Sequence, residues 1–288
     1  MPSDLLTEHP FVSYTLITIV SLMLGSFFNV VIYRLPKMME AQWRRDCLEL
    51  SGEEPSEDDN FNLALPHSHC PKCQAPVKAW QNIPVVSYIL LRGRCASCRA
   101  PIGLRYPVIE AATAILAVLA FAVFGLSLHG AAIAVFCWLL LIMTVIDIDH
   151  QLLPDSLTLP LLWLGLAFHS VTATIPLTDA VWGAMAGYLS LWSVYWLFKL
   201  LTGKEGMGYG DFKLLAALGA WMGWQVLPLI IILSSLVGAV LGGLTLALSG
   251  QGRSTPMPFG PYLAGAGLIA MFWGDTLLNA YLQFAGLK

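Results

Sequence analysis

The chain has 288 residues, of which 57% are hydrophobic and only 11% are charged, and its mean hydropathy is +0.70. Soluble domains carry about 25% charged residues, so this composition excludes a single water-soluble core. The net charge of −3 says little about partners, and we expect no nucleic-acid partner.

Apolar runs close to the about 20 residues that span a bilayer recur along the sequence. They predict membrane spans at 11–33, 106–126, 130–149, 156–175, 180–201, 211–224, 226–248 and 260–283. The sixth run is short, and Pro228 blurs its border with the seventh. The expected fold class is an all-α polytopic membrane protein with about eight transmembrane helices in contact with lipid.

Three regions are expected along the chain. Residues 1–33 contain the first transmembrane helix, and residues 34–105 form a polar loop. Residues 106–288 form a transmembrane domain of about seven helices. The loop is the one long polar segment of the sequence, so we expect it to fold outside the bilayer.

The basic residues predict the orientation. Of 15 Lys and Arg, ten lie between Arg34 and Arg105. With eight spans, the remaining ones except Lys288 fall on the same side as this loop. Basic residues remain cytoplasmic in membrane proteins. The loop is therefore expected in the cytoplasm and both termini on the opposite side.

Four cysteines in the loop have the spacing of a metal site. Cys70 and Cys73 form one CxxC pair, Cys95 and Cys98 form a second, and 21 residues separate the pairs. Two such pairs provide the four thiolates that Zn²⁺ prefers in tetrahedral sites. A reducing cytoplasm disfavours disulfides. We expect one structural zinc ion, because four thiolates leave no open coordination position.

Acidic residues in or beside predicted spans are costly and indicate function by default. The sequence has seven: Glu110, Asp147, Asp149, Asp155, Asp179, Asp211 and Asp275. Asp155 is expected to cap the fourth span. Glu110 is about one turn into the second span, where it can pair with Arg105 or reach the membrane interface. Asp179 and Asp275 lie near the outer ends of spans, within reach of solvent.

Asp147 and Asp149 end the third span on its cytoplasmic side. Residues two positions apart on a helix differ by about 200° in direction, so only one of them can point into a given site. Its partner must come from elsewhere, and Asp211 at the start of the sixth span is on the same side of the membrane.

A glycine-rich loop leads directly to Asp211. The stretch GMGYGDFKLL at 206–215 has glycine at 206, 208 and 210, which lets backbone approach other segments closely. Two carboxylates that share a proton form the acid/base pair of aspartic proteolysis. The same carboxylates equally fit a proton- or ion-coupled transporter, which is the alternative function.

Five motifs occur together and in order: GSFFNVVIYRLP at 25–36, the two CxxC pairs, IDIDHQLLPD at 146–155, GMGYGDFKLLAALGAW at 206–221 and PFGPYLA at 258–264. Together they resemble the type IV prepilin peptidases of bacterial pilus and type II secretion systems, over essentially the whole chain. The resemblance implies a bifunctional inner-membrane enzyme. One activity cleaves the short basic leader of prepilins and pseudopilins before an apolar helix. The other methylates the new N-terminal amine with S-adenosylmethionine.

The resemblance also implies roles for individual residues. The family belongs to the GxGD aspartyl proteases, and Gly208, Tyr209, Gly210 and Asp211 match that motif. The second catalytic aspartate matches Asp147, and the four loop cysteines match the zinc ligands of the family. The resemblance assigns no residue to the methyl donor. The sequence also has no glycine-rich nucleotide loop following a strand.

Overall fold

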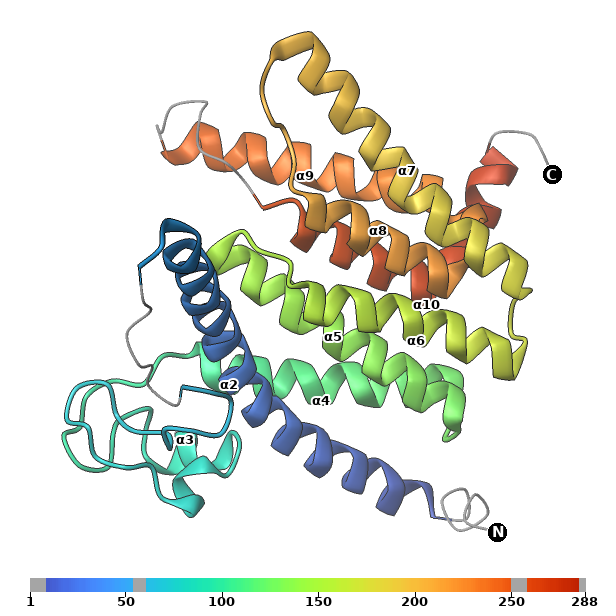
Figure 1. Ribbon diagram of the computed structural model, residues 1–288. Helices are drawn as coiled ribbons and strands as arrows, with labels where there is room; N and C mark the ends of the chain where they lie inside the picture. The colour runs from blue at the N-terminus through green and yellow to red at the C-terminus, as the bar shows by residue number, and fades with distance from the viewer. Residues whose placement is uncertain (1–8, 54–60, 250–257, 285–288) are drawn as a thin grey trace. The chain divides into compact units, whose positions relative to one another are not determined.

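The computed structural model describes residues 9–53, 61–249 and 258–284, and within these ranges the chain is helical with no β-strand (Figure 1). The predicted all-helical class is therefore confirmed. The chain divides into two compact units, residues 1–138 and residues 139–288. Helix α5 (Leu128–His150) begins in the first unit and ends in the second.

In the first unit, α2 (Pro10–Ser51) packs against α4 (Arg105–Phe124). The two backbones approach closely at Gly25, where an added Cβ atom would lie 2.7 Å from the Glu110 Cα. The predicted loop connects α2 to α4 in the sequence. It contains the 3-10 turn η1 (Ala79–Asn82) and the short helix α3 (Val86–Leu90).

Helix α2 continues well beyond residue 33, where the predicted first span ends. Its polar second half is rich in helix-forming residues such as Lys, Met, Glu, Gln, Arg and Leu. The helix ends at Gly52, which has φ +75° in the left-handed conformation that commonly terminates helices. The helix end is therefore set by a glycine C-cap and not by the membrane boundary.

The loop is anchored to α2 through Arg34, which is buried although it is charged. Its guanidinium donates hydrogen bonds to the carbonyl oxygens of Asn62 (2.7 Å) and Pro66 (2.5 Å). Nearby, the buried Asn29 side chain donates to the carbonyl oxygens of Gly25 and Tyr106, both at 3.2 Å. The GSFFNVVIYRLP motif thus supplies contacts that connect α2 to α4 and to the loop.

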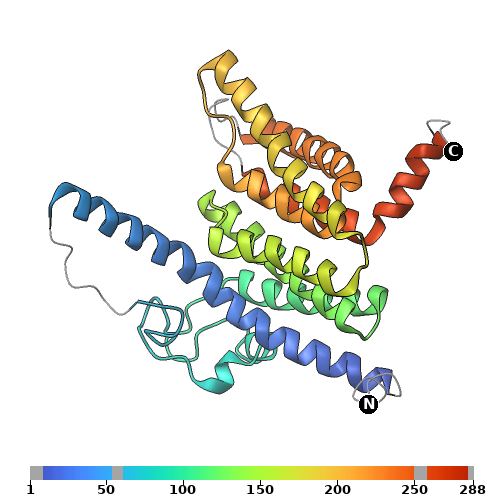
Figure 2. The same cartoon turned by 45° about the vertical axis from the view of Figure 1, so that its right-hand side comes forward.

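The second unit contains the end of α5 and five further long helices, among which α8 lies in the middle (Figures 1 and 2). These are α6 (Asp155–Thr172), α7 (Leu177–Thr202), α8 (Tyr209–Met222), α9 (Leu227–Ser249) and α10 (Gly260–Phe284). Helix α8 is apolar on all sides and packs against α6, α7 and α10. At Gly183 of α7 and Gly219 of α8 the backbones of the two helices approach each other closely.

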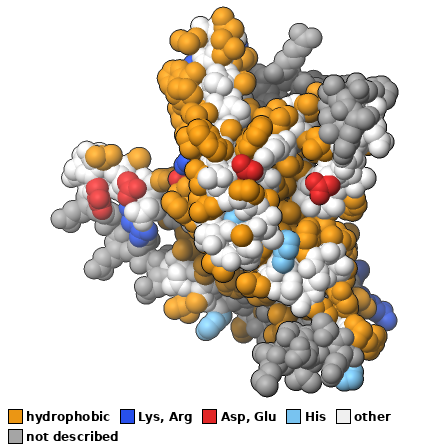
Figure 3. Space-filling model, turned by 90° about the vertical axis from the view of Figure 1, so that its right-hand side faces the viewer, with side chains coloured by type: hydrophobic (Ala, Val, Ile, Leu, Met, Phe, Trp, Pro, Cys, Tyr) orange, Lys and Arg blue, Asp and Glu red, His pale blue; other side chains and the backbone are white. Residues whose placement is uncertain are grey.

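Each predicted span overlaps one long helix of the structure. Among the described helices, five are long and apolar enough to cross a membrane: α2, α4, α5, the segment Trp224–Leu241 and α10. On the face shown in Figure 3, hydrophobic side chains predominate over charged ones. These features indicate a multi-pass membrane protein, as the composition predicts.

Candidate active site and metal centre

The last turn of α5 presents Asp147 to the interior of the second unit. The Asp147 side chain is 5% exposed, whereas the following residues Ile148, Asp149 and His150 are exposed. The prediction that Asp147 and Asp149 face different directions is therefore confirmed. Asp147 Oδ2 accepts a hydrogen bond from the backbone N–H of Gly260 at 3.0 Å, at the start of α10.

Asp211 lies in the first turn of α8 and is 7% exposed. Gly208 is the N-cap of this helix, and its backbone lies against the Asp211 carboxylate, where an added Cβ atom would be 3.7 Å from Oδ2. Tyr209 begins the helix with an exposed ring that packs against the rings of Tyr195 and Phe212.

Two of the three loop glycines make the close approaches that the sequence predicts. At Gly206 an added Cβ atom would lie 2.9 Å from the ring of Phe198, and at Gly210 it would lie 2.7 Å from the Cβ of Leu153. Gly208 is different, because it has room for a side chain and φ −81°, a conformation open to any residue. Its smallness matters in another way, since a side chain there would face the Asp211 carboxylate.

Leu153 brings the two aspartates into one site. It packs against Gly210, one residue before Asp211, and also against Gly260, whose amide binds Asp147. The Asp147 and Asp211 carboxylates are close enough to interact electrostatically. The structure therefore places the two predicted carboxylates in one buried cluster, formed where α5, α8 and α10 begin or end.

Asp155 does not cap α6, and this expectation was wrong. Asp155 is the first residue of the helix, and the N-cap position before it is occupied by Pro154. Instead both of its oxygens accept from Lys213 Nζ, at 2.6 and 2.7 Å. Because Lys213 is one turn of helix after Tyr209, this ion pair ties the start of α6 to the start of α8.

Gly260 and Leu153 are site residues that our sequence reasoning did not single out. Both lie within motifs noted above, PFGPYLA and IDIDHQLLPD. Neither residue carries reactive chemistry, so residue type alone gave no signal. Their contribution is steric and through the backbone, which only the folded structure reveals.

The four loop cysteines converge in the first unit. The Sγ atoms of Cys70 and Cys98 are 3.8 Å apart, those of Cys73 and Cys95 are 4.0 Å apart, and all four lie within 4.8 Å of one another. A tetrahedral zinc ion with Zn–S bonds of about 2.3 Å would separate its sulfur ligands by about 3.8 Å. The four thiols therefore fit a zinc ion.

The backbone around Cys70 and Cys95 favours the thiolate form of these two residues. The amides of Cys73 and Lys72 lower the pKa of the Cys70 thiol to about 6. The amides of Cys98 and Ser97 likewise lower the pKa of Cys95. Thiolate is the form of cysteine that binds metal, so the local backbone prepares these two residues as ligands.

The two CxxC pairs have the same local fold. In each, the first cysteine amide donates to a carbonyl five residues later, from Cys70 to Ala75 and from Cys95 to Ala100. An isolated β-bridge closes each turn, between His69 and Pro76 and between Arg94 and Pro101. Two equivalent turns facing each other give the paired knuckles that a four-thiolate site requires.

Comparison with known proteins gives the family of this chain. Residues 134–243, which include Asp147 and Asp211, match the type IV leader peptidase family, and residues 19–124 match the bacterial peptidase A24 N-terminal domain. The prepilin leader peptidase/N-methyltransferase of Pseudomonas aeruginosa is 55% identical over 286 residues, covering 99% of each chain. The chain belongs to the type IV leader peptidase family.

Two further relatives of the leader peptidase family have the same name. The Stutzerimonas stutzeri protein is 54% identical over 289 residues and the Legionella pneumophila protein 45% identical over 285 residues, each with 99% of both chains covered. No solved structure matches this chain. The predicted family, and with it the prediction that the chain is a peptidase, are confirmed.

A methyl donor is implied by the second half of the relatives' names. The described residues contain no β-strand, so they do not form the Rossmann type of nucleotide site. We therefore assign no residues to the donor itself.

Glu110 is a third buried carboxylate, in the first unit. It is 7% exposed, its Oε2 accepts a hydrogen bond from the backbone N–H of Val85 at 2.7 Å, and it interacts with the Ser26 side chain. Glu110 thus connects the membrane helices of the first unit to the loop just before α3.

Proposed function

We propose that this chain is a membrane aspartyl endopeptidase that removes the short basic leader of type IV prepilins and pseudopilins and then methylates the new N-terminal amine with S-adenosylmethionine. The observation that carries the proposal is the buried pair Asp147 and Asp211 beside the glycine loop. The names of relatives with over half of their residues identical support the substrate class and both activities.

The mechanism assigns one proton to the carboxylate pair. The ionised carboxylate takes a proton from a water molecule, and the oxygen of this water attacks the scissile carbonyl carbon. The protonated carboxylate donates a hydrogen bond to the carbonyl oxygen and then delivers its proton to the leaving nitrogen. The Gly260 amide holds Asp147 Oδ2, which leaves Oδ1 for this chemistry.

The surroundings of the pair suit this reaction. Leu153 and the backbones of Gly210 and Gly260 enclose the site and limit access of bulk water. A low-polarity environment strengthens the interaction of the carboxylates with the reacting atoms. Gly208 leaves room beside the Asp211 carboxylate for an extended substrate backbone to approach.

We further propose that all eight long helices cross the inner membrane, with both termini periplasmic. The distribution of basic residues then places the zinc loop and the carboxylate pair at the cytoplasmic surface. A basic leader is cytoplasmic, so its scissile bond at the membrane boundary would meet the pair there. One zinc ion, bound by Cys70, Cys73, Cys95 and Cys98, would stabilise the loop.

The test combines the purified full-length protein with a prepilin and follows leader loss and methyl addition by mass spectrometry. Asp147→Asn and Asp211→Asn should each lower the cleavage rate by at least about 10²-fold, because each removes one of the acid/base groups. Asp149→Asn, from an exposed position on the same helix, should retain cleavage. Wild-type protein that leaves the prepilin intact but couples solute flux to a proton gradient would support the transporter alternative instead.

A further inference from the structure

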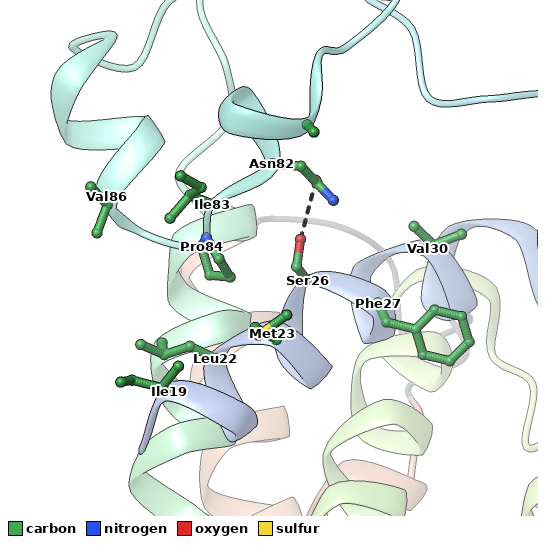
Figure 4. Close-up of a pocket in the computed structure, with 11 residues that line it drawn as sticks. Ile19, Leu22, Met23, Ser26, Phe27, Val30, Asn82, Ile83, Pro84 and Val86 are labelled. Atoms are coloured by element: carbon green, nitrogen blue, oxygen red, sulfur yellow. Dashed lines mark hydrogen bonds between the residues drawn. The ribbon is translucent and has the colours of Figure 1, made fainter. Parts of the chain in front are cut away.

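The first unit contains a cavity that the peptidase reaction does not use. It has a volume of about 550 Å³ and lies between α2 and the loop segment 79–86 (Figure 4). Its walls are mainly apolar, with Met23 and Phe27 from α2 and Ile83 from the loop. Ligand sites commonly have volumes of about 300–1,000 Å³, so the cavity is large enough for more than one side chain of a ligand.

Polar groups gather at one side of this apolar cavity. Ser26 Oγ donates a hydrogen bond to Asn82 Oδ1 at 3.3 Å, and Figure 4 shows these two side chains pointing toward each other. Glu110 does not line the cavity, but it interacts with Ser26, which does, and it is the one buried acidic side chain among the described residues of this unit. An apolar ligand that ends in an amine would therefore find hydrogen-bonding groups at this side, with the Glu110 carboxyl group next to Ser26.

The loop wall of the cavity is held in a strained conformation. Val85 has φ +58° and ψ −48°, and the amide of Val86 donates to the carbonyl of Pro84, which is the pattern of a classic γ-turn. This conformation is unfavourable for a β-branched residue. Glu110 holds it through the Val85 amide, and Pro84 and Val86 on either side both line the cavity. Strain of this kind is concentrated at functional sites.

We infer that this cavity binds the N-terminal end of a processed prepilin, with its first apolar side chain between α2 and the loop and its free amine near Ser26, Asn82 and Glu110. The inference rests on the proposed function and identifies where the amine that is methylated would be held. The residues of the Asp147–Asp211 site all belong to the second unit, so this cavity is separate from them in the chain. The α2 residues that line the cavity belong to a candidate membrane span. The apolar helix of a pilin in the bilayer would therefore be at the right depth to reach the cavity.

A crosslinking experiment tests the occupant directly. Full-length protein would carry p-benzoylphenylalanine in place of Met23, be reconstituted into lipid nanodiscs and be illuminated with a pilin whose leader has already been removed. We expect a crosslink to the first residues of the pilin. The control places the same group at Leu16, an exposed α2 residue two turns earlier that does not line the cavity, where we expect none. Crosslinks to lipid alone, or equal crosslinks to pilin from both positions, would overturn the inference.

A cavity-filling variant tests the consequence. Met23→Trp should lower the methylation rate by at least about tenfold through displacement of the amine, while leader cleavage stays unchanged and shows that the protein is folded. Leu16→Trp should leave both rates unchanged. Methylation by Met23→Trp at the wild-type rate would contradict the inference. Wild-type protein that removes the leader without adding a methyl group, or that does neither, would contradict the proposed function instead.

Discussion

Between Phe61 and Gly103 only Ser87 and Gly93 are buried, whereas in α8 every residue from Asp211 to Trp221 except Lys213 is buried. The cysteine loop therefore has no apolar core, and the helix around the carboxylate site is almost entirely core. The two regions depend on different forces for their stability. The loop needs a ligand, and the helical site needs close backbone packing.

Removal of zinc should separate the two regions most strongly. A structural zinc site contributes about 10–16 kcal/mol of binding free energy in zinc-finger peptides, and here no buried apolar side chain replaces it. After treatment with a strong chelator, the backbone amides of 61–103 should lose protection from hydrogen exchange while those of α8 keep it. Cys47→Ser, at an exposed cysteine outside the cluster, should leave zinc content unchanged. Retained protection of the loop without zinc would contradict this dependence.

The next largest effect should come from crowding the carboxylate site. In Gly260→Ala the new Cβ atom would lie 2.5 Å from Asp147 Oδ2, so that the carboxylate must move. A displacement of about 1 Å can reduce a rate by about 10²-fold, and we expect a loss of that order in leader cleavage. Gly265→Ala, on the same helix and with no atom within 4 Å of the new Cβ, is the matched control. Equal rates for the two variants would show that Asp147 is not held where the reaction needs it.

The smallest effect should follow loss of the ion pair between α6 and α8. Lys213→Met removes the partner of Asp155, whose side chain is 55% exposed. Exposed ion pairs contribute about 0–1 kcal/mol, so the melting temperature should fall by no more than about 2 °C. The exchanged pair, Lys213→Asp with Asp155→Lys, should recover part of this loss. A much larger fall in the melting temperature would mean that the stability of the helical unit depends on charge and not on packing.

The cluster of four cysteines was predictable because its signal is local. Two CxxC pairs specify the ligands by spacing alone, and each pair forms its own turn. The helices were also predictable, since each apolar run overlaps a helix of the structure. The end of α2 was not predictable in this way. The apolar run indicates where the chain leaves the membrane, whereas the helix itself continues as far as its C-cap at Gly52.

The carboxylate site was predictable only in part. Helical direction separated Asp147 from Asp149, and the glycine loop indicated Asp211. The contacts of Leu153 and the Gly260 amide depend on three segments far apart in the sequence, so no local pattern contains them. The same applies to Asp155, for which local capping was a reasonable expectation, although its partner Lys213 lies 58 residues away.

The most direct test of the central claim is a double-mutant cycle on leader cleavage with Asp147→Asn, Asp211→Asn and both together. Groups that act as one unit give strongly non-additive effects. We predict that each single variant loses at least about 10²-fold in rate and that the double variant is no slower than the slower single variant. If the two losses multiply, or if either single variant cleaves at the wild-type rate, Asp147 and Asp211 do not form a catalytic pair.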